Sequence, residues 1–231
     1  MLCAKVRQLT TGAAERSLGG MGERITKLDA LRAATVYGEP FAHMAVRDFI
    51  RDQAVEGLDA DCPVISLRGS FPIPTVKSGE MFRRLVEELR EPEFTEVVGH
   101  KLNMHLAGLP TMVTYRGWTA GGERNDGRVH VDDEAKVATA LLYLNPVWDK
   151  SNGRLRLLHS DDLEDVVLEV PPIMGSLVIF KNAPNAFHGY TEHIGHRRAI
   201  QLNWMTGKWF TRWEIARHTF SAYTKQLRLP R

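Results

Sequence analysis

The sequence contains little cysteine, no long hydrophobic segment and almost no net charge. Only two cysteines occur in 231 residues, Cys3 and Cys62, so the chain has no disulfide framework and suits a reducing compartment. No apolar run approaches the roughly 20 residues that cross a bilayer, and residues 1–7 lack the apolar core of a secretory signal. A formal net charge of +2 does not indicate a strongly basic nucleic-acid binder. We therefore expect a cytoplasmic protein without a membrane or nucleic-acid partner; the sequence does not indicate its oligomeric state.

The composition is typical of one globular domain. Hydrophobic residues make up 43% of the chain and charged residues 25%, which is ordinary for such a protein. The length is sufficient for a single substantial core, and no internal repeat or linker is apparent. We expect residues 1–231 to form one domain, with mostly helical support over 25–108, a barrel core over 111–206 and a C-terminal helix over 211–228.

The first half of the chain has hydrophobic residues at helical spacing. One helix is predicted from about residue 25 until Gly38-Glu39-Pro40, and another around 49–54, closing at Gly57. Ser78 is expected to cap a third helix. Glu91-Pro92 should separate this helix from a fourth. No catalytic cluster is recognisable in this half.

The second half changes to short β-rich segments separated by turn signals such as Ser151-Asn152-Gly153 and Pro171-Pro172. Six or more such strands at near-regular spacing predict an antiparallel sandwich or barrel rather than a doubly wound sheet. The predicted strands of this half cover residues 111–115, 137–144, 154–158, 166–170, 177–180, 187–190 and 199–204, and one short strand over 41–46 is predicted in the first half.

The stretch Gly127-Arg128-Val129-His130-Val131-Asp132 contains a possible metal-binding pair. His130 and Asp132 are two residues apart in a stretch with strand character, so their side chains should leave the same face. His188 is the candidate for a third ligand, although His193 and His196 lie close enough to compete with it. Two histidines and one carboxylate on one face of a metal are the ligands of non-haem Fe(II) oxygenases.

An arginine follows His188 by nine or ten residues, at the start of the next predicted strand. From there, Arg197 or Arg198 could project into the same pocket and bind a carboxylate through two parallel hydrogen bonds.

Residues 127–204 resemble the Fe(II)/2-oxoglutarate-dependent dioxygenases, in particular the subgroup shaped like the prolyl hydroxylases. The resemblance implies a mainly β fold with flanking helices, built on a double-stranded β-helix, the jelly-roll or cupin-like barrel. The motifs that carry it are Asp126 to Asp132, Tyr143-Leu144-Asn145-Pro146-Val147-Trp148, Gly153-Arg154-Leu155-Arg156-Leu157 and Arg197-Arg198-Ala199-Ile200.

The resemblance also implies a chemistry. His130, Asp132 and His188 would be the catalytic iron ligands, and Tyr143 and Arg197 would bind the far carboxylate of the cosubstrate, with Arg198 as the rival to Arg197. The cofactors would be Fe(II), 2-oxoglutarate and O2, with ascorbate as a candidate reductant. The cosubstrate would be converted to succinate and CO2. Because Asp132 is retained, hydroxylation of a C–H bond is favoured over halogenation.

The sequence offers few candidates for substrate-binding residues. The loop over 116–127 is expected to be either a charged flexible turn or a lid over the iron, in which Arg116 and Arg124 meet an anionic group. Strand parity points Asn203 into the same pocket. These residues favour a small, anionic metabolite as substrate. The alternatives are a divalent-metal hydrolase, which would need a general base, and a non-catalytic cupin-like module that binds a carboxylate.

Overall fold

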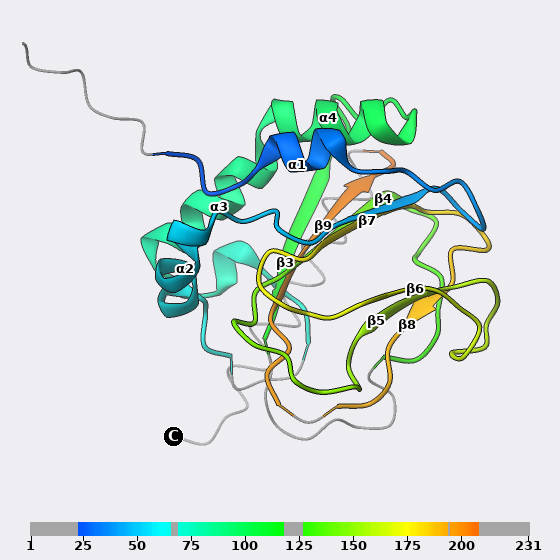
Figure 1. Cartoon of the computed structure of the whole chain (residues 1–231). Coiled ribbons are helices and arrows are strands. Elements are labelled where there is room, and N and C mark those ends of the chain that lie inside the picture. Colours follow the sequence, from blue (N-terminus) through cyan, green and yellow to red (C-terminus); the bar gives the residue numbers. More distant parts are fainter. Residues whose placement is uncertain (1–22, 66–68, 118–126, 194, 208–231) are drawn as a thin grey trace, which may run out of the picture.

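The computed structural model describes residues 23–65, 69–117, 127–193 and 195–207. The strands of this part lie in two antiparallel sheets, and the helices pack beside the larger one (Figure 1). The lead over 1–22, the tip of the loop that contains Arg124, and the predicted helix over 211–228 lie outside the described residues.

The larger sheet has six strands in the order β1-β7-β4-β9-β3-β2. In its centre β9 pairs with β4, so that Asn203 lies opposite Thr139 and Ala199 lies opposite Tyr143. Residues that are directly opposite in an antiparallel pair share one face of the sheet. The strands are β1 His43–Val46, β2 Phe71–Pro72, β3 Thr111–Arg116, β4 Lys136–Tyr143, β7 Leu177–Lys181 and β9 Ala199–Met205.

The smaller sheet contains β5 (Leu155–Leu158), β6 (Val166–Val170) and β8 (His188–Gly189), in the order β6-β5-β8. An isolated antiparallel bridge pairs His130 with His188, on the edge of β8 that does not pair with β5. After β3 the chain thus enters the smaller sheet near residue 130 and returns to the larger sheet as β4. It then passes through β5 and β6, returns as β7, crosses to β8 and returns once more as β9. This winding between two sheets is the predicted double-stranded β-helix.

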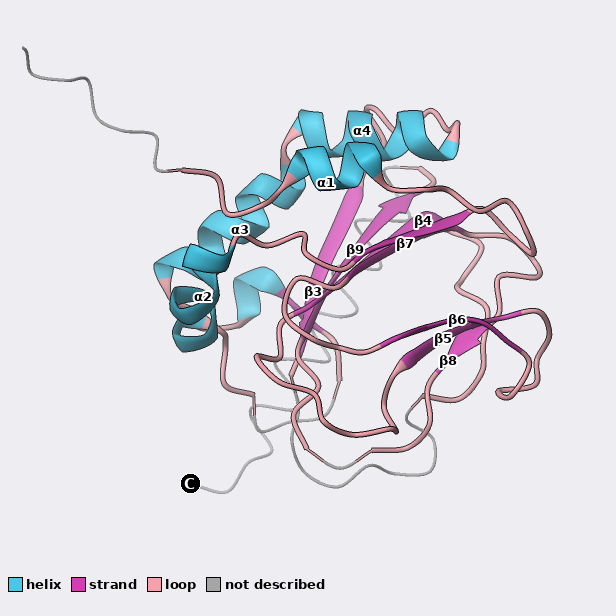
Figure 2. Cartoon of the chain, in the orientation of Figure 1, coloured by secondary structure: helices cyan, strands magenta, loops and turns pink. Residues whose placement is uncertain are grey.

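The helices group on one side of the strands (Figure 2). The indole of Trp204, on β9, stacks on the ring of Phe94, on α4, with a centroid separation of 6.1 Å. Because Ile200 and Leu202 belong to the same hydrophobic core, alternate residues of β9 face the helices. The intervening residues face the space between the sheets. The helices are α1 Leu28–Ala33, α2 Val55–Asp61, α3 Glu80–Arg90 and α4 Pro92–Leu102, with 3₁₀ turns over Asp52–Ala54 and Ile73–Thr75.

Three local predictions in the first half were wrong. The first helix ends at Ala33, before Gly38. The second continues through Gly57 to Asp61. Ser78 does not cap α3. This helix begins at Glu80, its N-cap residue is Gly79, and no side chain of the cap residue forms a hydrogen bond there. Instead, the backbone N–H of Met81 donates to Oδ2 of Asp61 over 2.7 Å. A carboxylate that is distant in sequence thus satisfies a donor of the first turn, which a local pattern does not reveal.

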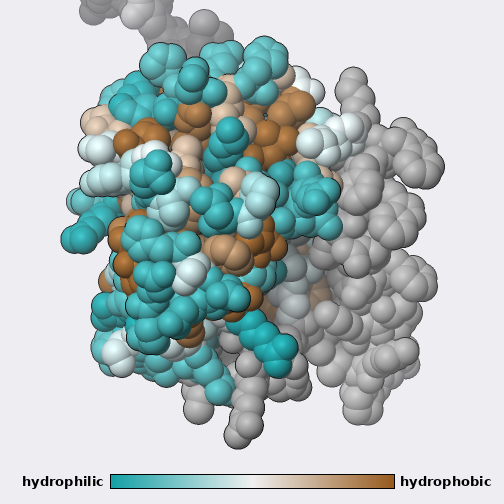
Figure 3. All heavy atoms as spheres, turned by 90° about the vertical axis from the view of Figure 1, so that its right-hand side faces the viewer, coloured by the Kyte–Doolittle hydropathy of each residue, from teal (hydrophilic) through white to brown (hydrophobic). Residues whose placement is uncertain are grey.

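The described surface is largely polar. On the side shown in Figure 3, hydrophilic residues cover most of the surface that is not grey, with smaller hydrophobic areas between them. Among the described residues, no helix has the length and hydrophobicity that a bilayer crossing requires.

Candidate metal centre

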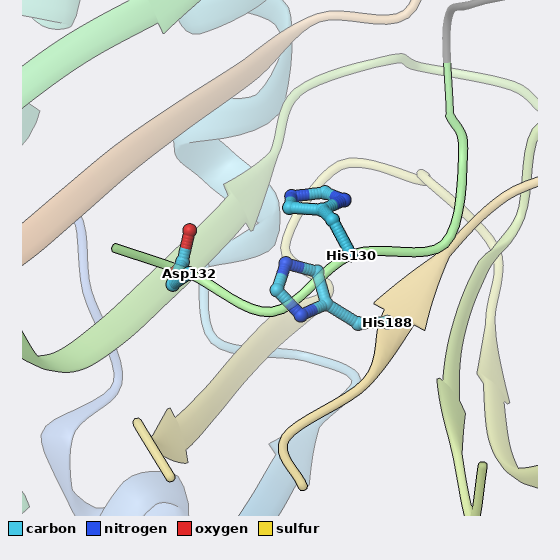
Figure 4. A group of neighbouring side chains, drawn as sticks. All are labelled: His130, Asp132 and His188. Atoms are coloured by element: carbon cyan, nitrogen blue, oxygen red, sulfur yellow. The ribbon is translucent and has the colours of Figure 1, made fainter. Parts of the chain in front are cut away.

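His130, Asp132 and His188 come together between β8 of the smaller sheet and β4 of the larger sheet. One potential ligand atom from each residue lies within 4.8 Å of the others, and the two imidazole centroids are 4.3 Å apart. Figure 4 shows the three side chains grouped around a common space, with His188 projecting from β8 and the other two from the segment that bridges to it. A strand was expected over residues 127–132, but the structure has only an isolated bridge there, at His130. The three side chains converge all the same.

Both histidines are oriented by backbone carbonyls. Nδ1 of His130 lies 2.8 Å from the carbonyl oxygen of Arg128, and Nδ1 of His188 lies 3.0 Å from that of Ala186. Because a carbonyl only accepts, each Nδ1 carries the hydrogen, and each Nε2 presents its lone pair to a metal. Burial lowers the pKa of His188 to about 4, which keeps this imidazole neutral near pH 7.

The carboxylate of Asp132 is held by two neighbours. Nζ of Lys136 lies 2.5 Å from its Oδ1, and the hydroxyl of Thr139 donates to Oδ2 over 2.6 Å. Burial alone would raise the pKa of Asp132, but the positive charge of Lys136 and these two hydrogen bonds together lower it. The group is therefore ionised at neutral pH. Two imidazoles and one carboxylate fit the donor set that a ferrous ion prefers.

Gly127 allows the bridging segment to approach β8. Its φ of 86° lies in the left-handed region that favours glycine. A Cβ at this position would lie 2.3 Å from the carbonyl oxygen of Tyr190. The close approach lets the N–H of Tyr190 donate to the carbonyl of Gly127 over 2.8 Å, and this contact aligns His130 with His188.

Arg197 lies inside the barrel, and its neighbour Arg198 does not. The guanidinium of Arg197 donates through Nη2 to the hydroxyl of Tyr143 over 2.9 Å and through Nε to the carbonyl of Gly153 over 2.8 Å. It also lies 3.9 Å from the ring centroid of Tyr190. The guanidinium of Arg198 instead forms an ion pair with Asp59.

The charge of Arg197 has no counter-charge within the described parts of the chain. Only 9% of the residue is exposed, and both of its hydrogen bonds go to neutral oxygens. Burial raises the pKa of Tyr143 more than Arg197 lowers it, so the phenol stays protonated. Since buried cations are normally paired, this guanidinium and phenol are suited to receive an anion.

The remaining candidates are dispersed. Arg116 ends β3 opposite Ala199 and is exposed. Asn203 is buried beside Thr139. The ring of His193 packs near Trp148, with centroids 5.5 Å apart, rather than in the metal-binding group. The sequence reasoning missed Lys136 and Thr139. Thr139 has the same strand parity as Tyr143, which could have indicated that it faces the barrel interior.

The pKa of His188 predicts how the stability of the metal-free protein depends on pH. The imidazole has an ordinary pKa of 6.5, whereas in the folded protein it is about 4. Between these values the unfolded chain binds a proton that the folded chain excludes, so stability falls as the pH decreases through this window. We expect the free energy of unfolding, measured with urea, to decrease by about 2–3 kcal/mol from this residue between pH 7 and 4.5. His188→Gln should show a smaller decrease; an equal decrease in both proteins would contradict the assignment.

The fold and the His-Asp-His group together are typical of the non-haem iron oxygenases. In agreement, residues 115–206 match the family model described as the 2OG-Fe(II) oxygenase superfamily. The match covers the barrel core, and the activity of the whole chain is treated below as a proposal. Fe(II), 2-oxoglutarate and O2 are the cofactor and cosubstrates of that family.

Solved structures with a similar shape include two prolyl hydroxylases. A prolyl-4-hydroxylase from Pseudomonas putida is 19% identical over 71% of this chain and 91% of that chain, with a TM-score of 0.48. A prolyl hydroxylase from Trichoplax adhaerens, solved with a peptide of the hypoxia inducible factor oxygen degradation domain, is 17% identical over 75% and 86%, with a TM-score of 0.45. No curated protein matches the sequence.

Proposed function

We propose that the chain hydroxylates a C–H bond of a small, anionic metabolite, and that residues 1–231 form a single domain for this reaction. In this proposal His130, Asp132 and His188 hold the iron, and Arg197 and Tyr143 bind 2-oxoglutarate. The observation that carries it is the nearly buried guanidinium of Arg197, which has no acidic partner among the described residues and lies in the same barrel as the metal-binding group.

The iron supplies the oxidising chemistry when it is bound: 2-oxoglutarate and O2 become succinate and CO2 while one oxygen atom enters the C–H bond. The chain positions the three metal-binding side chains. Carbonyl groups fix the two imidazoles, and Lys136 and Thr139 fix the carboxylate. These contacts fix the orientation of the three ligands, which favours metal binding.

The cosubstrate is a dicarboxylate, and the chain offers a suitable group for its far end. Arg197 uses Nε and one N–H of Nη2 for Gly153 and Tyr143, so its remaining N–H groups are available to a carboxylate. Tyr143 accepts from Arg197, which leaves its own hydrogen for the same ligand. Together they can form two or three charge-assisted hydrogen bonds.

The charge of the site favours an anionic substrate. The two charges of Fe(II) balance those of 2-oxoglutarate, and Asp132 balances Lys136, with which it forms an ion pair. Arg197 and Arg116 then leave the site positive. Arg116 is close enough to lower the pKa of Tyr143, and its place opposite Ala199 sets it on the barrel side of β3.

Spectroscopy tests the proposal and its alternatives. Fe(II) and 2-oxoglutarate added without oxygen should produce the visible charge-transfer band of the chelate, and oxygen should then release succinate. A metal hydrolase should not give the band, and a passive carboxylate-binding module should not release succinate. A screen for increased succinate release should include amino acids, nucleotides, sugar phosphates and proline-containing peptides. Stimulation only by the peptides or by uncharged compounds would overturn the assignment of an anionic metabolite.

Arg116→Ala should weaken substrate binding selectively. The loss of one charge-assisted hydrogen bond corresponds to about a tenfold or greater increase in KM for the substrate that the screen identifies. Uncoupled succinate release in the absence of that substrate should remain nearly unchanged. Arg90→Ala, an exposed arginine at the end of α3, removes the same charge away from the site and serves as the control. An equal loss of coupled and uncoupled turnover in Arg116→Ala would contradict a substrate contact.

A further inference from the structure

A lysine lies beside the candidate metal centre, which is an unexpected place for a positive charge. Nζ of Lys136 is 2.5 Å from Oδ1 of Asp132, and the two groups form an ion pair. The side chain of Lys136 is 17% exposed and that of Asp132 is 4% exposed, so dissolved salt screens the pair only weakly. Because like charges repel, this ammonium opposes the binding of any cation at Asp132.

The turn between the two residues fixes the position of the ammonium. The backbone N–H of Lys136 donates to the carbonyl of Asp133 over 2.9 Å, and that of Ala135 donates to the Asp133 carboxylate over 2.8 Å. Nδ2 of Asn182, which directly follows β7, lies 2.9 Å from the carbonyl oxygen of Asp133 and 3.0 Å from that of Lys136. Backbone contacts on both sides of the turn thus hold the base of the lysine side chain next to Asp132.

The ion pair leaves the carboxylate able to bind a metal. A carboxylate has about four lone-pair positions on its two oxygens. Lys136 uses one of them on Oδ1, and the hydroxyl of Thr139 uses one on Oδ2. Among the described residues, Asp132 is the only acid that pairs with Lys136. An ion bound to Asp132 therefore shares this carboxylate with a fixed positive charge.

We propose that Lys136 makes the metal centre discriminate between the two oxidation states of iron, stabilising Fe(II) relative to Fe(III). This inference rests on the proposed function, which uses ferrous iron. The repulsion between a fixed charge and a bound ion is proportional to the charge of the ion, so Fe(III) is destabilised more than Fe(II). At an effective dielectric constant of about 20, one additional unit charge a few ångströms away changes an equilibrium constant by more than about tenfold.

The test is a mediated redox titration of the iron-loaded protein without 2-oxoglutarate, followed by the electron paramagnetic resonance signal of high-spin Fe(III). The electron that Fe(II) loses passes to the soluble mediator. Lys136→Gln and Lys136→Met remove the charge, and the first retains a hydrogen-bond donor. We expect the midpoint potential to fall by at least about 59 mV in both variants, which is a tenfold rise in the affinity for Fe(III) relative to Fe(II). Lys136→Arg keeps the charge and should restore most of the potential.

Two controls separate the effect of the charge from support of the carboxylate. Thr139→Val removes the neutral donor on the other oxygen of Asp132. It should weaken Fe(II) binding by about 10–100-fold but move the potential less than Lys136→Gln does. Lys181→Gln removes the same charge from an exposed lysine at the end of β7 and should have the potential of the wild type.

The outcomes distinguish this inference from the proposed function. An unchanged potential in both uncharged variants, an equal fall in Thr139→Val, or loss of iron binding from both uncharged variants would overturn the role of Lys136. An iron-loaded wild type that gives no charge-transfer band with 2-oxoglutarate would overturn the proposed function instead.

Discussion

Replacement of His188 by alanine should abolish tight binding of ferrous iron. The imidazole supplies one of three ligands, and its Nε2 is already presented by the contact between Nδ1 and the carbonyl of Ala186. Changes in groups that only support a ligand cost about 10–100-fold in metal affinity, so loss of the ligand itself should cost more than about 100-fold. Anaerobic titration with Fe(II), followed by 2-oxoglutarate, should give no charge-transfer band. Succinate release should be at background.

His196→Ala is the matched control. This exposed histidine was a rival ligand in the sequence and is absent from the group formed by His130, Asp132 and His188. The variant should bind iron and release succinate as the wild type does. If His196→Ala lost iron and His188→Ala kept it, the assignment of the metal centre would be wrong.

The sequence predicted the barrel well because its signals are local. Each short strand of the second half alternates or is wholly hydrophobic, and each is bounded by glycine, proline or asparagine. The predicted strand over 199–204, for example, is β9 (Ala199–Met205) in the structure. The His-x-Asp spacing alone did not identify the metal-binding residues, because His159 and Asp161 share it. The resemblance to the oxygenase family indicated His130, Asp132 and His188.

Features that depend on distant contacts could not be predicted in the same way. Arg197 and Arg198 are adjacent and chemically identical, and the difference between them comes from Asp59, more than a hundred residues away, which pairs with Arg198. Lys136 was not recognised because its role follows from the turn that brings its amine to Asp132. The cap of α3 was wrongly assigned to Ser78 because the group that accepts from its first turn is distant in sequence. This group is the carboxylate of Asp61, on a preceding helix.

Arg197→Met should lose most of its affinity for 2-oxoglutarate while it retains iron. Methionine preserves much of the side-chain volume but removes the charge and the donors to the far carboxylate. Truncation of one partner of a buried charge pair costs about 2–5 kcal/mol, which corresponds to at least roughly a thirtyfold increase in the dissociation constant. The titration is read from the charge-transfer band of the Fe(II)-loaded protein.

Arg198→Met tests the same change one residue away. Because Arg198 is engaged with Asp59 on the helical side, this variant should lower the midpoint of thermal unfolding but leave the affinity for 2-oxoglutarate within about twofold of the wild type. 2-Oxopentanoate, which has no far carboxylate, should bind equally to wild type and Arg197→Met. The affinity of Arg197→Met for 2-oxoglutarate should fall towards the value for that monocarboxylate. If Arg198→Met instead lost the affinity and Arg197→Met did not, the anchor would be the outer arginine, and the unpaired charge inside the barrel would need another ligand.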